Sequence, residues 1–508
     1  MKNFLLVIFS SIVTIAAIYW MFLTGVNSAR KFSIDGSSCL SVLPLIAELE
    51  LKKSSDKYQG DLRCAHQLNV LAESLNPQKE NSNTFEIYFH RLSETDSTME
   101  DPDAFGALLE RLRDAAPKYV TVYIHGWRHD DTVGDGDVQK FRTFLGYTRK
   151  FLNQRPELAG HQEIGIYLSW RGAAVRESGI IDGRTIAALA SFWDRKAQSE
   201  KHAPSAKLAL LRISDALNIK GDPNSKNKML VVGHSMGGNM LATELTDAFN
   251  DQIDKKEYIT APYGNLVVLL NPAAEAEKWI NIQVREQEVN KLYHLDQRPV
   301  YMSITSTDNW SADETGNGKV EYDSATGMIF PIAQIAAFTN FDSLKYTAIG
   351  HFFKNPATPY GASHEIINNL GANIETGFRA LLSSENNSRC DEATGWLYSV
   401  RKRQQNSGRN ISGWDSAYIG GKLDTLTYVR NNQRKIGDSS KNIAYQIRHG
   451  LSPAGKGSGS VNSPADPSTP FWNVRAFQNV IDDHGTVVNY PFWCAVNQMV
   501  MDDIVKQQ

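Results

Sequence analysis

Short apolar runs, rich in β-branched and aromatic residues, alternate with stretches of helical periodicity along much of the chain. Six of these runs have the length and composition of buried strands: 85–92, 119–127, 163–172, 228–235, 265–274 and 299–308. The intervening helical stretches include 137–153 and 205–216. Strands that alternate with helices are joined by crossover connections. The pattern therefore predicts an α/β fold with a mostly parallel sheet and helices on both faces.

The alternation stops near residue 310 and returns at residue 471, where a last strand and a final helix are expected. The expected units are a core of 84–310, an insertion or cap over 311–470 with a flexible segment at 451–470, and a closing part of the core at 471–508. The insertion thus precedes the last strand.

The first residues show no polar face. No charged residue stands between Lys2 and Arg30, and an apolar run fills residues 4–23. Twenty such residues can cross the hydrocarbon core of a bilayer. We expect residues 1–28 to form a transmembrane anchor with the body of the protein on the non-cytoplasmic side, followed by a helical extension over 29–83. Cleavage after "VNSA" as a signal peptide is the alternative, and it would give a secreted or periplasmic protein.

Composition changes this picture little. The 508 residues are 42% hydrophobic and 21% charged, which is typical of a globular protein. The net charge of −3 gives no basic surface for nucleic acid. The four cysteines, Cys39, Cys64, Cys390 and Cys494, have no metal-binding or redox spacing, although an exported chain would permit a Cys39–Cys64 disulfide. We expect no metal and no cofactor.

The stretch "KMLVVGHSMGGNMLATEL" places a serine between a predicted strand and a predicted helix. Its centre, 233–237, reads Gly-His-Ser-Met-Gly. A strand–turn–helix with Ser235 at its tip is the setting of a nucleophile elbow. Gly233 and Gly237 fit this setting, because a sharp turn brings backbone segments too close for side chains. A glycine-rich turn without chemistry is the alternative.

A serine nucleophile needs amide donors for the oxyanion that forms when it attacks a carbonyl. The amide of Met236 follows the serine at the start of the helix. The pair His125-Gly126 follows an earlier predicted strand, in "YIHGWRHD". Gly126 would let the backbone turn so that the amide of Trp127 becomes the second donor.

The segments "VYIHGW", "SWRG" and "VVGHSMGG", in this order on successive strands, resemble the α/β-hydrolase superfamily of serine esterases and lipases. The likeness is strongest to bacterial members with an HG oxyanion turn and a GHSMGG elbow, and it covers about 85–310 and 470–508. It implies the α/β-hydrolase fold and a triad in the chain order nucleophile, acid, histidine.

Several acidic residues and histidines are compatible with that order. Asp308 ends the run 299–308, just beyond its strand part Val300–Ile304, and is the preferred acid; Asp313 and Glu275 are the alternatives. The histidines that follow Asp308 are His351, His364, His449 and His484. His484 is the preferred base, because it lies between the predicted last strand and the final helix, and His351 is second.

The sequence thus predicts a serine hydrolase that cleaves carboxylic esters through Ser235, Asp308 and His484. Its substrate would be a small-molecule or lipid ester, and the N-terminal helix would hold it at the membrane. Thioesterase, acyltransferase and peptidase chemistry use the same fold. A membrane-associated binding or scaffold protein without catalysis is the alternative from another class.

Overall fold

The structure is a computed structural model. The residues it describes are 73–74, 84–92, 102–129, 131, 135–153, 158, 160–172, 184–219, 225–255, 259–260, 262–289, 299–307, 330, 348–350, 364–368, 445–449, 470–477, 481, 484–485, 493, 496–497 and 500. The predicted anchor, the extension at 29–72 and all four cysteines lie outside them. Within these ranges no helix is long and apolar enough to cross a membrane.

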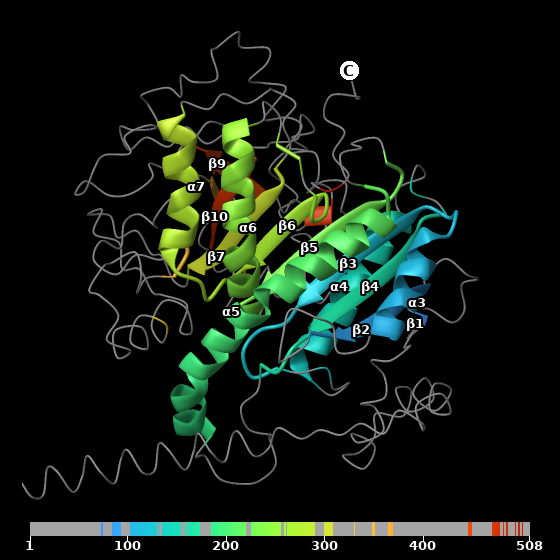
Figure 1. Cartoon of the computed structure of the whole chain (residues 1–508), viewed down its shortest axis with the longest axis horizontal. Helices are drawn as coiled ribbons and strands as arrows, with labels where there is room; N and C mark the ends of the chain where they lie inside the picture. Colours follow the sequence, from blue (N-terminus) through green and yellow to red (C-terminus); the bar gives the residue numbers. More distant parts are fainter. Residues whose placement is uncertain are drawn as a thin grey trace, which may run out of the picture.

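A ten-stranded sheet forms the centre of the molecule (Figure 1). Its strands are β1 (Glu73–Ser74), β2 (Thr84–Arg91), β3 (Lys118–Ile124), β4 (Gln162–Ser169), β5 (Lys228–His234), β6 (Leu266–Leu270), β7 (Tyr301–Thr307), β8 (His364–Asn368), β9 (Tyr445–His449) and β10 (Phe471–Phe477). Their order is β1-β2-β4-β3-β5-β6-β7-β10-β8-β9. The pairs from β2 to β8 are parallel, and only β1 and β9 pair antiparallel, at the two edges. The prediction of a mostly parallel sheet is confirmed.

Helices cover both faces of this sheet. They are α3 (Pro102–Arg113), α4 (Gly136–Asn153), α5 (Arg184–Ala216), α6 (Met236–Lys255) and α7 (Ala276–Glu288). Buried side chains of α3, α5, α6 and α7 pack together on one face. Those of α4 pack on the other face, together with Trp493, Val496 and Val500 near the end of the chain.

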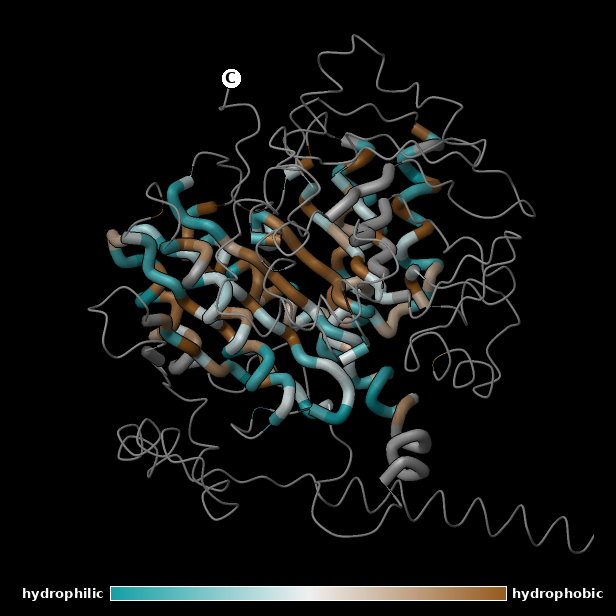
Figure 2. The backbone as a smooth tube through the Cα atoms, turned by 180° about the vertical axis from the view of Figure 1, so that it is seen from behind, coloured by the Kyte–Doolittle hydropathy of each residue, from teal (hydrophilic) through white to brown (hydrophobic). Residues whose placement is uncertain are grey.

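The strands form because their side chains are apolar on both faces. In β3, Val120, Val122 and Ile124 point into the first of these two clusters, whereas Tyr119 and Tyr123 point into the second. All are fully buried. Figure 2 shows the consequence, with hydrophobic strands in the middle and hydrophilic positions on the outer helices. Such runs are typical of parallel sheets buried on both sides.

Helix α5 differs from the prediction, because it begins at Arg184 rather than near residue 205. Proline removes a backbone donor and often marks a helix boundary. Here Pro204 lies inside the helix, and the helix continues through it because buried residues on both sides, including Ser199 and Ala206, pack on the same core. In Figure 1 the first turns of α5 extend beyond the sheet.

The expected insertion at 311–470 contributes two strands that the sequence did not predict. β8 lies next to β10, and β9 pairs with β8 in the register His364↔His449. Both strands have only five residues, which are too few for an apolar pattern to identify them as strands. The strand β10 therefore lies inside the sheet, between β7 and β8.

Candidate functional site

Ser235 stands alone between β5, which ends at His234, and α6, which begins at Met236. Its φ of 55° lies in the left-handed region, which residues other than glycine rarely adopt. Its amide donates to the carbonyl of Leu270 (3.0 Å), and its carbonyl accepts from the amide of Ala273 (2.9 Å). Neighbouring backbone thus holds the serine in a strained turn, a conformation that clusters at functional sites.

The glycines on either side of this turn allow three backbone segments to meet. A Cβ on Gly237 would overlap the carbonyl oxygen of Ile124 at the end of β3. A Cβ on Gly233 would come within 2.7 Å of the carbonyl oxygen of Gly237. The first turn of α6 can therefore approach β3 closely only with glycine at these positions.

The turn after β3 lies against the serine. A Cβ on Gly126 would stand 2.8 Å from the Cβ of Ser235, so a side chain there would displace the serine. Two residues later, Arg128 has a φ of 70°, and its amide donates to the carbonyl of Gly172 (2.9 Å). Trp127 lies between these two residues, so the backbone on either side of it is held in place.

His125 fixes the start of the same turn from within the core. Its Nδ1 donates to the carbonyl of Gly126 (3.0 Å), and its Nε2 accepts from the amide of Trp170 (3.1 Å). One donor and one acceptor are what a neutral imidazole offers. Burial lowers the pKa of His125, in agreement with the neutral form.

Two amides at this site have no hydrogen bond to any described residue: those of Trp127 and Met236. The Met236 amide is one of the first N–H groups of α6, which have no acceptor within the helix. Amides at a helix N-terminus favour a negative charge nearby. Together these groups can stabilise an oxyanion beside Ser235.

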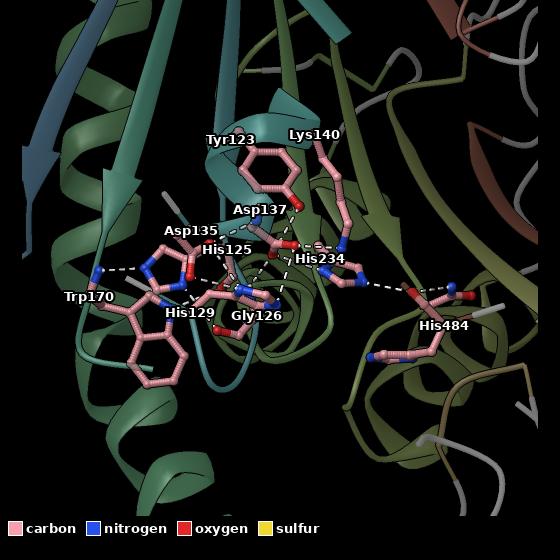
Figure 3. A network of polar contacts seen from close by, with 11 residues as sticks. Tyr123, His125, Gly126, His129, Asp135, Asp137, Lys140, Trp170, His234 and His484 are labelled. Atoms are coloured by element: carbon pink, nitrogen blue, oxygen red, sulfur yellow. Dashed lines mark hydrogen bonds and ion pairs between the residues drawn. The ribbon is translucent and has the colours of Figure 1, made fainter. Parts of the chain in front are cut away.

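Asp137, in the first turn of α4, is fully buried next to His234, the residue that precedes the serine (Figure 3). Its carboxylate accepts from the Tyr123 hydroxyl (3.2 Å), the Gly126 amide (3.3 Å), the Lys140 ammonium (2.8 Å) and His234 Nδ1 (3.1 Å). Burial alone would raise the pKa of Asp137, but His234, His129 and Lys140 outweigh it and hold the pKa well below its usual range. The carboxylate is therefore ionised.

His129 is a second histidine beside this carboxylate. Its Nδ1 donates to Asp135 (2.9 Å), and its Nε2 lies 3.4 Å from Asp137 Oδ1. Burial lowers the pKa of His129, but Asp135 and Asp137 outweigh burial, so its pKa is raised. The loop between β3 and α4 is thus tied to the buried carboxylate at several points.

His234, the residue before the serine, connects this carboxylate to His484. Its Nε2 lies 2.8 Å from the backbone carbonyl oxygen of His484, and the rings of the two histidines are 5.1 Å apart. Burial lowers the pKa of His234, and the charge of Asp137 opposes this effect. His484, the predicted base, thus stands beside the residue that precedes Ser235, although 250 residues separate them in the chain.

Asn271 holds the same carbonyl from the end of β6. Its Nδ2 donates to the carbonyl of His484 (3.0 Å), and its Oδ1 accepts from the amide of Ser306 in β7 (2.7 Å). Its φ of 44° is again left-handed, a conformation that asparagine tolerates better than most residues. The loop that carries His484 is therefore anchored to β5 and β6 at one atom.

The other predicted acids and bases fall into two groups. Asp308, Asp313 and His351 lie outside the described residues; Asp308 is the residue that follows β7. Glu275 is engaged elsewhere, in ion pairs with Lys196 and with Lys278 (2.9 Å). Burial raises its pKa, but the two lysines outweigh burial and lower the pKa to about 2.

His364 and His449 belong to the far edge of the sheet. The register runs from His234 through β6, β7 and β10 to His364, which pairs with His449. Four strand spacings separate β5 from β8, a distance on the order of 19 Å. Their backbones are therefore much farther from the serine turn than that of His484.

Sequence reasoning missed three residues that organise this site: Asp137, Asn271 and the side chain of His234. An acidic residue at the start of a helix ordinarily favours the helix dipole from the surface, so nothing in the sequence indicated that Asp137 is buried. His234 was seen only as the variable position of the serine motif. Asn271 comes directly after a predicted strand, which was the one available signal.

No group of three or more His, Cys, Asp or Glu residues in the described ranges could hold a metal ion. Comparison of the chain with protein-family models, curated proteins and solved structures finds no match. The chemistry of the site therefore has to be inferred from its own residues.

Proposed function

We propose that this protein is a serine hydrolase of the α/β-hydrolase fold that cleaves carboxylic esters through an acyl-enzyme. The observation that carries the proposal is the left-handed backbone of Ser235 at the strand–helix turn, with the glycine turn of Gly126 packed on it. A serine held in this way presents its hydroxyl at the carboxyl edge of the sheet. A protein without catalysis has no need to maintain such strain.

The sheet topology supports the fold part of the proposal. The site lies after β3, β5 and β6, at the carboxyl ends of parallel strands, where open α/β sheets bind their ligands. β7 and β10 both end at this edge, because Thr307 pairs with Phe477. Asp308 is the residue that follows β7 in the sequence, and His484 follows β10.

In the proposed reaction, His484 removes the proton of the Ser235 hydroxyl as the oxygen attacks the ester carbonyl. The resulting oxyanion accepts hydrogen bonds from the amides of Trp127 and Met236. His484 then gives the proton to the departing alcohol. Water, deprotonated by the same imidazole, hydrolyses the acyl-serine and releases the acid. Asp308 holds the imidazole and stabilises its positive charge.

The first test is labelling by a fluorophosphonate, which phosphonylates activated serines. The wild-type protein should react at Ser235, and Ser235→Ala should lose all labelling without a change in melting temperature. Ser225→Ala, a buried serine outside the motif, is the matched control and should label normally. A folded wild-type protein that does not react would favour the non-catalytic scaffold.

Alanine variants identify the partners of the serine. We expect His484→Ala and Asp308→Ala to lose labelling, whereas His351→Ala and Asp313→Ala keep it. Full reactivity of His484→Ala would exclude His484 as the base. The pH dependence of the labelling rate should follow one deprotonation, that of the base.

Substrate class is addressed with p-nitrophenyl esters of increasing acyl length. Activity confined to short chains would exclude a lipase and retain an esterase. Turnover of thioesters, or acyl transfer to alcohols in place of water, would identify the related thioesterase or acyltransferase. The anchor proposed for residues 1–28 predicts that the full chain sediments with membranes, whereas a chain cleaved near "VNSA" would be released.

A further inference from the structure

The side chains around Asp137 and His234 form one connected unit, shown in Figure 3. It runs from Lys140 to the Asp137 carboxylate, on to the His234 ring and then to the backbone carbonyl of His484. The same carboxylate accepts from the amide of Gly126. The turn after β3, the last residue of β5 and the backbone of His484 after β10 thus meet at the side chains of Asp137 and His234, neither of which has a place in the reaction described above.

The His234 ring contacts an acceptor at each nitrogen. Nδ1 faces the carboxylate Oδ2 of Asp137 at 3.1 Å, and Nε2 faces the carbonyl oxygen of His484 at 2.8 Å. Neither oxygen can donate, so both contacts are hydrogen bonds only when both ring nitrogens carry a proton. Burial lowers the pKa of His234 and so favours the neutral ring, which donates to one of the two oxygens at a time, whereas the charge of Asp137 opposes this effect.

We propose that His234 is a positioning residue, which holds the backbone of the base His484 in reach of Ser235 while Asp137 holds both His234 and the oxyanion turn at Gly126. The proposal rests on the proposed hydrolase function for its catalytic consequence. Its structural part, the anchoring of the His484 loop, stands on the contacts alone. Asn271 supplies the second donor to the same carbonyl.

Two substitutions test the contacts of the two ring nitrogens of His234 separately. In His234→Gln, the amide nitrogen can take the place of Nε2, which keeps the donor to the His484 carbonyl and loses the one to Asp137. In His234→Asn, the amide nitrogen takes the place of Nδ1, which keeps the contact with Asp137 and loses the anchor. Both variants remove the ring, so a general loss of packing affects them alike.

The experiment measures fluorophosphonate labelling and hydrogen–deuterium exchange of the full chain. We expect His234→Asn to label between about 10-fold and 100-fold more slowly than the wild type, with His234→Gln close to the wild type. The peptide that contains His484 should exchange faster in the asparagine variant only. Asn271→Asp replaces the second donor with an oxygen of the same shape, so it should match His234→Asn and provides the test if that variant does not fold.

Wild-type labelling by His234→Asn, with normal exchange of the His484 peptide, would overturn the proposal. Equal losses in the asparagine and glutamine variants, with equal falls in melting temperature, would also overturn it and leave a packing role only. If the wild type itself does not label at Ser235, the hydrolase proposal fails, and the exchange data alone decide whether His234 anchors the loop.

Discussion

Three non-glycine residues with left-handed backbone stand after neighbouring strands of the sheet: Arg128 after β3, Ser235 after β5 and Asn271 after β6. Each such conformation costs on the order of 1–3 kcal/mol. The surrounding contacts must offset this cost, and they do so with backbone and side-chain hydrogen bonds to adjacent strands. Small changes in this packing should therefore affect activity strongly.

Gly126→Ala tests this packing directly. The added methyl group would stand 2.8 Å from the Cβ of Ser235, so either the turn at Gly126 or the serine must move. Displacements of about 1 Å can cost about 100-fold in rate, and we expect a loss of that size in fluorophosphonate labelling. Gly106→Ala is the control, because no atom lies within 4 Å of its added Cβ in helix α3. It should label normally and gain about 0.5–1 kcal/mol of stability.

The serine turn could be predicted from the sequence. Glycines that flank a serine between a strand and a helix indicate a turn in which backbone segments lie too close for side chains. The glycine after His125 carried similar information. The pairing of Asp137 with His234 could not be predicted, since it depends on which loops the sheet order brings together. The contacts of the His484 carbonyl could not be predicted either. Every residue has a backbone carbonyl, so the residue type does not indicate which carbonyl accepts such hydrogen bonds.

Glu163 is a second buried carboxyl, with a different chemistry. It lies in β4 with no hydrogen-bond partner for either oxygen among the described residues. Burial raises its pKa well above the usual value, and Arg149 only partly opposes this. Folding therefore favours the protonated form of Glu163, whereas in the unfolded chain the carboxyl ionises in its usual range.

A folded-state pKa that is raised gives stability present below the unfolded pKa and lost as the pH rises towards the folded value. Glu163→Gln removes this loss, because the amide has a similar shape and does not ionise. We expect the variant to be more stable at pH 8 by about 1.4 kcal/mol for each pKa unit of the shift. The gain should vanish near pH 4. Urea unfolding at both pH values measures it, and an equal difference at the two would refute a proton-linked origin.

At the scale of elements, a cluster of charges joins three helices. Lys196 of α5 pairs with Glu275, in the turn before α7, and with Glu200 (2.6 Å). Lys278 of α7 contacts the same two carboxylates, and it donates to Asn239 of α6 (2.9 Å). Lys196 is almost fully buried. The cluster therefore lies between the helices, where it determines how they pack, and is not a set of solvent-exposed ion pairs.

Lys196→Met should leave Glu275 with one cation in place of two. Removing one partner of a buried pair costs about 3–5 kcal/mol, which urea unfolding would detect. Lys207→Met is the control: it breaks another α5–α6 ion pair, with Glu244 (3.0 Å), whose members are partly exposed. Its cost should stay below about 1 kcal/mol. Similar losses in the two variants would contradict a special role for the buried cluster.

Elements with strong apolar runs were predicted from the sequence, with ends close to those observed. Helix α5 was predicted too short, because a proline in its middle hides the continuity that packing enforces. β8 and β9 were missed, since each has only five residues and gains its place by pairing with β10 and with each other. Their stability comes from distant partners, which local patterns do not contain.

At the scale of the whole molecule, the end of the chain completes the core. Trp493 lies 3.9 Å from Phe144 between ring centres, on the face covered by α4. Asn497 accepts from the buried hydroxyl of Tyr119 (2.6 Å), and its amide donates to Thr148 (3.2 Å). The sequence predicted a closing helix here, but not that it packs beside α4.

Trp493→Ala should therefore destabilise the whole domain. Emptying a buried tryptophan site costs about 3–5 kcal/mol, and the urea midpoint should fall accordingly. Val289→Ala, at an exposed position after α7, is the control and should change stability by less than about 0.5 kcal/mol. A midpoint for Trp493→Ala close to that of the control would mean that the C-terminal segment is not part of the cooperative unit.

The position of β10 inside the sheet has a consequence for synthesis. β7 ends at Thr307 and its partner begins at Phe471, so at 5–20 residues per second the ribosome needs roughly 10–30 s to make the intervening chain. During that interval the hydrogen-bonding edge of β7 lacks the strand that will cover it. Open edges of this kind invite pairing with other nascent chains. Production of this protein should therefore depend on chaperone capacity more than its final stability would suggest.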